Sequence, residues 1–364
     1  MTPRTIADIQ TPALILDAAA MQRNIERMAD FYRDGPTKLR PHFKAHKTPE
    51  IARRQLAAGS VSGLTCATVN EAEIVADFCE DILIANQVIG ADKVARVAAV
   101  AARGIDMKIA IDSTTGLEQI SRAAQDAGTE VGVVVDINVG MPRCGVAPEE
   151  AAELARRAAE APGVVLRGLM GYEGHAVGIP ERDKREHVAR GAMVRLLEAA
   201  ASLQGAGLAC EIVSAGGTGT YDITGRMDGI TEIQAGSYVL MDTAYGKLDI
   251  PFEQAMWVLG TVISRPSPTL CVTDSGHKAC TEDHGNPDVH GVEGASLLFL
   301  SDEHASIILP ADSRIEVGDR IMLTPSHIDP TINLHDAFYV VDGETVVDIW
   351  PVTARGYAEQ RRYE

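Results

Sequence analysis

Between residues 38 and 237, short apolar runs alternate with longer stretches rich in Ala, Glu and Arg. The runs have the length of buried strands, and there are eight of them: residues 39–43, 64–68, 82–85, 107–111, 131–137, 165–172, 210–214 and 232–235. The stretches between them, most clearly 148–161 and 185–204, carry apolar residues at every third or fourth position, as amphipathic helices do. Eight strands alternating with helices predict a parallel (β/α)₈ barrel, the TIM barrel, with a doubly wound sheet as the alternative.

The pattern changes near Thr243. From there on, short β-rich segments are separated by turn residues: 255–264, 270–273, 295–299, 305–309, 320–324, 337–341 and 344–350. No stretch with the periodicity of the earlier helices is found among them. We therefore expect two domains, a barrel over residues 1–242 and an all-β domain over residues 243–364.

Composition narrows the classes of function. The chain has 364 residues, and 33 Lys and Arg against 51 Asp and Glu give a net charge of −18. This charge argues against nucleic acid or an anionic membrane as the main partner, and aromatic residues, at 4%, are too scarce for base-stacking surfaces. The six cysteines form no CxxC pair, and the N-terminus has no signal-like apolar run. We expect a cytoplasmic protein with reduced thiols and no membrane-spanning helix.

The segment from Arg40 to Lys47 holds two histidines and two lysines at the end of the first predicted strand. Strand alternation would place His42, Lys44 and His46 on one face. A lysine desolvated at a barrel strand end, close to other cations, has a lowered pKa and suits Schiff-base formation. A solvated basic turn is the alternative interpretation.

Two loops are candidates for binding an anion. The first runs from Ser214 through Gly216, Gly217 and Thr218 to Thr220, after the seventh predicted strand. The second follows the eighth strand and is the sequence Gly236-Ser237-Tyr238. Barrels often hold phosphate after these two strands, where backbone N–H groups and hydroxyls converge. No lysine follows the glycines as in a P-loop, so ATP is not expected. Each loop taken alone is equally compatible with a tight turn.

His327 and Asp329 are separated by one residue. On a strand, both side chains would face the same way and could share a Mn²⁺, Zn²⁺ or Mg²⁺ ion. A hydrogen-bonded pair at a loop end is the alternative. His277, His284 and His290 form a second candidate cluster, but they lie in a polar stretch and are interpreted mostly as surface histidines.

Six motifs, taken in order along nearly the whole chain, resemble the D-threonine aldolase and D-serine dehydratase family. They are TPALILD from Thr11, RPHFKAHK from Arg40, RCGV from Arg143, GGTG from Gly216, QAGSY from Gln234 and PSHIDPT from Pro325. This resemblance implies a fold-type III pyridoxal-phosphate (PLP) enzyme related to alanine racemase. The implied fold, a barrel followed by a β domain, agrees with the hydrophobic pattern, and the implied assembly is a homodimer.

The resemblance also implies roles. Lys44 would be the Schiff-base lysine, and His327 and Asp329 the ligands of a divalent metal. The residues implied to bind the cofactor beside Lys44 are Arg143, Tyr172, Ser214, Gly216, Gly217, Thr218, Gly236, Ser237 and Tyr238. Because the chain as a whole is acidic, the cations that bind an anionic cofactor and substrate must lie in the site itself. Arg40, Lys44 and Arg143 are the candidates.

One residue type separates the branches of the family. The dehydratase branch has Cys where this chain has Asp329, and the carboxylate favours Mn²⁺ or Mg²⁺ over Zn²⁺. We therefore expect an aldolase that cleaves a D-3-hydroxy amino acid, D-threonine-like, into glycine and an aldehyde, with His175 as the general base. The alternatives are a D-serine or 3-hydroxyaspartate dehydratase and a non-catalytic PLP-binding protein. Glu173 and His277 depart from the family pattern and have no assigned role.

Overall fold

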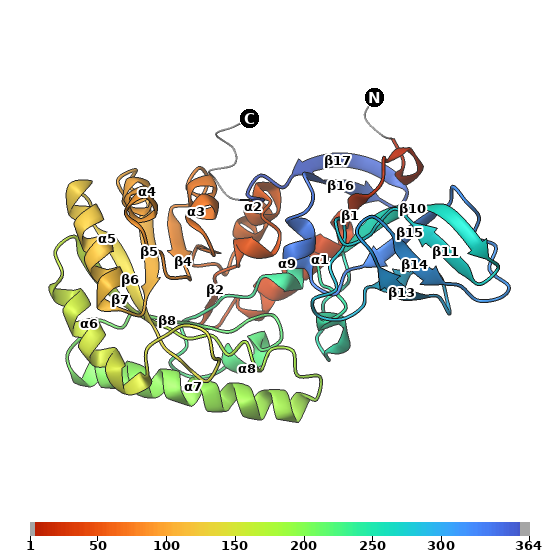
Figure 1. Ribbon diagram of the computed structural model, residues 1–364. Helices are drawn as coiled ribbons and strands as arrows, with labels where there is room; N and C mark the ends of the chain where they lie inside the picture. The colour runs from red at the N-terminus through yellow and green to blue at the C-terminus, as the bar shows by residue number, and fades with distance from the viewer. Residues whose placement is uncertain (1–3, 357–364) are drawn as a thin grey trace. The chain divides into compact units, whose positions relative to one another are not determined.

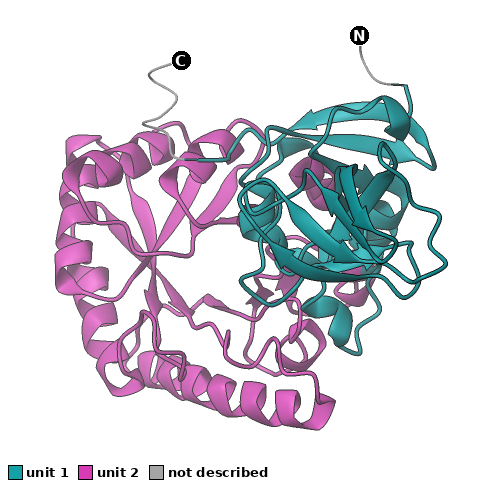
Figure 2. Ribbon diagram, turned by 45° about the vertical axis from the view of Figure 1, so that its right-hand side comes forward, with its two compact units in different colours: residues 1–27, 45–50, 237–364 teal, residues 28–44, 51–236 magenta. Residues whose placement is uncertain are grey.

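A computed structural model describes residues 4–356 of the protein (Figure 1). These residues form two compact units (Figure 2). Of the described residues, unit 1 comprises 4–27, 45–50 and 237–356, and unit 2 comprises 28–44 and 51–236. Among the described residues, no helix is both long enough and apolar enough to cross a membrane. None of the six cysteines, all of which lie among the described residues, is in a disulfide bond.

Unit 2 contains the eight parallel strands that the apolar runs predicted. They are β2 (Lys38–Leu39), β3 (Leu64–Cys66), β4 (Asp81–Ile84), β5 (Asp106–Ile111), β6 (Val131–Asp136), β7 (Val164–Met170), β8 (Ile212–Ala215) and β9 (Glu232–Ile233). Their order is β2-β9-β8-β7-β6-β5-β4-β3, and parallel bridges from Leu39 to Val61 and from His42 to Thr65 join the two ends. The curled sheet of the predicted barrel is confirmed.

Helices lie outside this sheet (Figure 1). They are α2 (Pro49–Ala57), α3 (Val69–Val75), α4 (Ala91–Ala101), α5 (Thr114–Asp126), α6 (Ala151–Glu160), α7 (Arg182–Gly205) and α8 (Tyr221–Thr224), while α1 (Ala18–Phe31) precedes β2. Hydroxyl caps start two of them: Thr68 accepts from the N–H of Glu71, and Ser113 from that of Gly116. Strand β6 is buried at every position, so its run of valines can pack against both the barrel interior and the helices.

Unit 1 is built on strands, and seven of them correspond to predicted segments. These are β10 (Met256–Ser267), β11 (Leu270–Thr273), β13 (Ser296–Leu300), β14 (Ala305–Ile308), β15 (Arg320–Thr324), β16 (Ala337–Asp342) and β17 (Thr345–Pro351). The sequence missed β12 (Asp288–His290) and the short helix α9 (Ile328–Ile332).

The chain's first strand, β1 (Ala13–Asp17), belongs to the sheet of unit 1. It pairs antiparallel with β10 and parallel with β16, and Leu14, Ile15 and Leu16 are completely buried. The compact units therefore do not follow sequence order, because this strand is sandwiched between two later ones. A functional boundary near Thr243 stays a prediction.

Two local expectations about strands were wrong. Residues Phe43–Ala45 form a 3₁₀ turn, so His42, Lys44 and His46 do not share one strand face. His327 precedes α9 instead of lying on a strand, and Asp329 is in the first turn of that helix. At the first place the chain leaves its strand earlier than predicted, because β2 ends at Leu39. At the second, β15 ends at Thr324 as predicted, and His327 lies beyond its end.

Candidate functional sites

In unit 2, the predicted lysine follows the first barrel strand. Lys44 is half-buried in the turn after β2, and the backbone N–H of His42 donates to the carbonyl of Ala235 at 3.2 Å. Because Ala235 follows β9, the carboxyl ends of the first and last barrel strands are neighbours here. Gly236, predicted to bind phosphate, is the next residue and is buried. Carboxyl strand ends are where barrel enzymes place their chemistry.

Arg40, another cation of this segment, forms ion pairs with two carboxylates. Its guanidinium donates to Glu232 at 2.8 Å and to Asp81 at 2.5 Å, and the residue is almost completely buried. Asp81 also pairs with Lys108 at 2.8 Å. The expectation that Arg40 serves an anionic ligand was therefore wrong, because buried Glu232 and part-exposed Asp81 already neutralise it.

The structure brings three of the other predicted residues of unit 2 together. The guanidinium carbon of Arg143 lies 5.4 Å from the ring centre of Tyr172. A Cβ built on Gly217 would lie 3.3 Å from the same ring, so the absence of a side chain there lets the tyrosine approach the loop after β8. His175 is exposed and lies against Gly140, in the loop that leads to Arg143.

The loop after β8 is buried from Ser214 to Thr220. Gly216 has a φ of +76°, and a Cβ there would lie 2.7 Å from Ile233, so the position demands glycine. The N–H of Gly216 donates to Glu173 at 3.1 Å, and that of Gly217 donates to Thr220 at 3.2 Å. These two amides are bonded within the protein.

A glycine-rich loop, an aromatic ring and an arginine fit a phosphorylated cofactor. Ser214, Thr218 and Gly236 are further hydrogen-bond donors in unit 2. The remaining two predicted residues, Ser237 and Tyr238, are buried in unit 1, where the ring of Tyr238 packs on Phe252 at 5.4 Å. The assignment of these residues to the cofactor stays a prediction.

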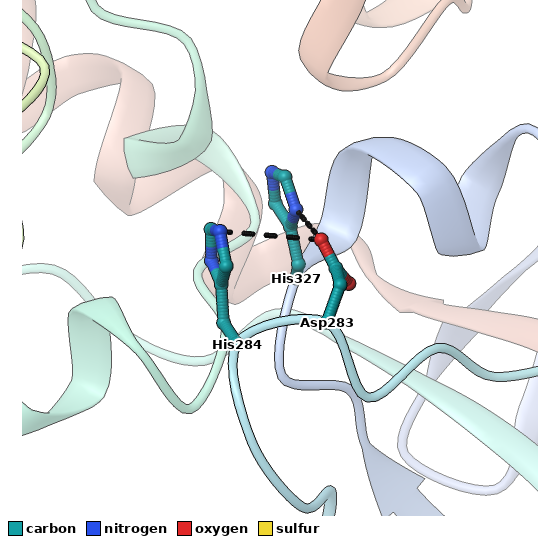
Figure 3. Close-up of side chains that lie close together, drawn as sticks. All are labelled: Asp283, His284 and His327. Carbon is teal, nitrogen blue, oxygen red and sulfur yellow. Dashed lines mark hydrogen bonds and ion pairs between the residues drawn. The ribbon is translucent and has the colours of Figure 1, made fainter.

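In unit 1, two histidines and an aspartate form a candidate metal centre (Figure 3). One ligand atom each from Asp283, His284 and His327 lie within 4.8 Å of one another. Nδ1 of His327 is 2.7 Å from Oδ2 of Asp283, and the ring of His284 stacks on that of His327 at 4.1 Å. The predicted partner Asp329 places Oδ2 at 3.8 Å from Nε2, the other ring nitrogen of His327.

Imidazole and carboxylate ligands fit a divalent transition metal or Mg²⁺. The hydrogen bond to Asp283 leaves Nε2 of His327 facing Asp329, an arrangement typical of a metal-bound histidine with a carboxylate behind it. Burial alone would raise the pKa of Asp283, but the hydrogen bond to His327 holds it below its ordinary value.

A buried carboxylate, that of Asp242, holds the start of α9 next to this centre. Asp242 accepts from the N–H of Ile328 at 3.3 Å and from that of Tyr245 at 2.9 Å, which anchors the start of α9. Burial raises the pKa of Asp242 to about 6, and the hydrogen bond from Tyr245 opposes that rise. The first turn of α9, which carries Asp329, is thereby tied to the segment before β10.

Sequence reasoning missed Asp283 and assigned His284 to the surface. His284 is exposed, as expected, but its ring also packs on a predicted metal ligand. The acid–histidine pair at 283–284, in a loop already rich in histidines, was the available signal. The other two histidines of that loop lie elsewhere: His277 is 3.5 Å from Glu282, and the ring of His290 packs on Trp257 at 4.7 Å.

Comparison with known families gives two matches. Residues 16–244 match the alanine racemase N-terminal domain, and residues 255–341 match a putative serine dehydratase domain. Two curated relatives cover nearly all of both chains. D-threonine aldolase from Arthrobacter sp. is 38% identical over 97% of this chain and 94% of its own, and 3-hydroxy-D-aspartate aldolase from Paracoccus denitrificans is 36% identical over 96% and 93%.

Solved structures show the same similarity. The D-threonine aldolase of Filomicrobium marinum superposes with a TM-score of 0.94 at 38% identity, covering 97% of this chain and 98% of its own. The D-threo-3-hydroxyaspartate dehydratase of Delftia sp. HT23 superposes with a TM-score of 0.88 at 27% identity, covering 98% of this chain and all of its own.

Proposed function

Because this chain belongs to the family that joins an alanine racemase N-terminal domain to a serine dehydratase domain, and is similar to D-threonine aldolase and 3-hydroxy-D-aspartate aldolase over nearly its whole length, we propose that it is a PLP- and metal-dependent aldolase. Its substrate is a D-3-hydroxy amino acid, D-threonine-like, which it cleaves into glycine and an aldehyde. The pair His327 and Asp329, with Nε2 and Oδ2 3.8 Å apart, is the observation that carries the choice of an aldolase.

Cleavage of the Cα–Cβ bond leaves an electron pair on Cα and requires the β-hydroxyl to lose a proton. Pyridoxal phosphate, when bound, supplies the acceptor for that electron pair. Lys44 would hold the cofactor covalently, and Arg143 and Tyr172, which contact each other, would help to position it. The loop from Ser214 to Thr218, with Gly236, Ser237 and Tyr238, binds its phosphate.

His175 is exposed and free to reach solvent, which suits a base that must exchange protons in every turnover. Its imidazole takes the proton of the β-hydroxyl. A divalent metal, when bound, lowers the pKa of that hydroxyl. His327 and Asp329 hold the metal, and Mn²⁺ or Mg²⁺ suits the carboxylate better than Zn²⁺. A homodimer in the cytoplasm remains part of the proposal.

The test is product identification with a panel of D- and L-3-hydroxy amino acids in the presence of PLP and Mn²⁺. An aldolase gives glycine and an aldehyde from the D-isomers, and a chelator stops the reaction until Mn²⁺ is restored. Turnover that survives complete chelation would remove the metal from the proposal. Binding of PLP without turnover of any substrate would favour a non-catalytic PLP-binding protein.

A dehydratase is the second candidate, because the Delftia dehydratase has the same fold over the whole chain. It predicts ammonia and a keto acid in place of glycine and an aldehyde. The same mass measurement separates the two candidates.

A further inference from the structure

The sequence singled out Glu173 without giving it a role. This glutamate follows the carboxyl end of β7 and is completely buried in unit 2. A carboxylate in such a place is costly unless donors satisfy it. The structure supplies three: the N–H of Gly216 at 3.1 Å, the hydroxyl of Thr220 at 2.7 Å and the hydroxyl of Thr224 at 2.6 Å.

Two of these donors come from the glycine-rich loop after β8, and the third comes from α8, which follows it. The N–H of Gly217 donates to Oγ1 of Thr220, and that hydroxyl in turn donates to Glu173. Two consecutive backbone amides of the loop are thus connected to one carboxylate, one directly and one through a hydroxyl. The conformation fixed in this way includes the positive φ of Gly216.

We propose that Glu173 is a positioning residue that holds the Ser214–Thr220 loop in its phosphate-binding conformation. The inference rests on the proposed function, because it needs a phosphorylated cofactor. Three hydrogen bonds that converge on one buried side chain hold the loop in a single conformation. A loop ordered by them when the protein folds loses little conformational entropy when the phosphate binds. Glu173 therefore improves recognition of the phosphate without touching it.

A purely structural role for this buried carboxylate is the competing explanation, and it predicts a different pattern of binding. A structural defect would weaken PLP and its dephosphorylated form, pyridoxal, to the same degree. A defect confined to the phosphate loop weakens PLP alone, because pyridoxal has the same ring and the same aldehyde but no phosphate. The ratio of the two affinities therefore separates the explanations.

The experiment is titration of the full-length chain, stripped of cofactor, with PLP and with pyridoxal. In Glu173→Gln, one acceptor oxygen becomes an NH₂ group that confronts the donors of the loop. We expect the affinity for PLP to fall about ten- to a hundredfold, the range for buried donors that lose their acceptor, and that for pyridoxal to stay unchanged. Glu232→Gln, a buried glutamate at the amino end of β9, is the matched control and leaves the ratio as in the wild type.

A second pair of variants decides the matter if Glu173→Gln does not fold. Thr220→Val removes the hydroxyl that links Gly217 to Glu173, and Thr220→Ser keeps it. The affinity for PLP divided by that for pyridoxal should fall in the valine variant and return to the wild-type value in the serine variant. Equal losses for both ligands, or no loss for either, would overturn the role of Glu173 while leaving the proposed function intact. A wild type that binds neither ligand would overturn the proposed function itself.

Discussion

The two candidate sites are proposed to bind ligands of opposite charge, and they differ in how they are built. The loop of unit 2 offers backbone and hydroxyl groups that are completely buried and fixed on Glu173. The cluster of unit 1 offers imidazole and carboxylate side chains that remain 47% exposed at Asp283 and 24% exposed at His327. Hydrogen bonds within the protein hold the buried loop, whereas the side chains of the cluster are partly open to solvent. Mutations should therefore affect folding and affinity together in the loop, and mainly affinity in the cluster.

The largest effect should come from Lys44, which is proposed to bind the cofactor covalently. Lys44→Ala should abolish both turnover and the visible absorbance of lysine-bound cofactor, because no other amine is assigned to that bond. Absorbance spectra and glycine production measure the two effects. Lys47→Ala is the control, three residues further along the same segment, and should keep both properties. Turnover by the Lys44 variant would contradict the assignment of the cofactor-binding lysine to Lys44.

His327 tests the candidate metal centre of unit 1. His327→Ala removes the imidazole that contacts both Asp283 and Asp329, so the affinity for Mn²⁺ should fall by more than the roughly 10–100-fold loss typical of an outer-shell partner. The thermal midpoint and the affinity for PLP should change little, because the residue is in unit 1 and part-exposed. Calorimetric Mn²⁺ titration measures the loss. His290→Ala, an exposed histidine of the same unit, should bind Mn²⁺ as the wild type does.

Asp283 should give a smaller effect, and its size decides how the cluster binds the ion. As the hydrogen-bond partner of Nδ1 of His327, it only orients the ligand, so Asp283→Asn should lower Mn²⁺ affinity about 10–100-fold. A loss as large as that of His327→Ala would instead make Asp283 a direct ligand, together with His284. The same titration distinguishes the two arrangements.

The last prediction concerns the stability of the barrel unit and not the affinity for a ligand. Asp136 ends β6, and burial raises its pKa from 3.8 to about 6 although Gln87 donates to it at 2.8 Å. Between those two pKa values the folded state keeps a proton that the unfolded chain releases, so stability falls as pH rises through this window. At about 1.4 kcal/mol per unit, the wild type should lose up to about 3 kcal/mol relative to Asp136→Asn.

Urea unfolding of both proteins at a series of pH values measures this slope. Asp283→Asn, studied with a chelator present, is the matched control. The pKa of Asp283 is lowered, so its contribution is present at neutral pH and is lost as pH falls, which gives a slope of the opposite sign. Slopes of the same sign in the two variants would contradict the contrast between a buried and an exposed site.

The hydrophobic pattern predicted the barrel because each strand is a local apolar run, and the positions of Lys44 and of the glycine-rich loop follow from strand ends. It could not predict that β1 pairs with β10 and β16, since that contact joins segments more than two hundred residues apart. The short helix α9 depends on Asp242 accepting from Ile328, another distant contact. Asp283 and Glu173 are also placed by tertiary hydrogen bonds, and such contacts produce no periodic pattern in the sequence.

The central claim, an aldolase as opposed to a dehydratase, is tested most directly with one substrate, D-3-hydroxyaspartate. An aldolase splits it into glycine and glyoxylate, whereas a dehydratase converts it into oxaloacetate and ammonia, and both pairs account for every atom of the substrate. The chain should release glycine and glyoxylate in equal amounts when Mn²⁺ and PLP are present. Release of ammonia and oxaloacetate with no glycine would contradict the account.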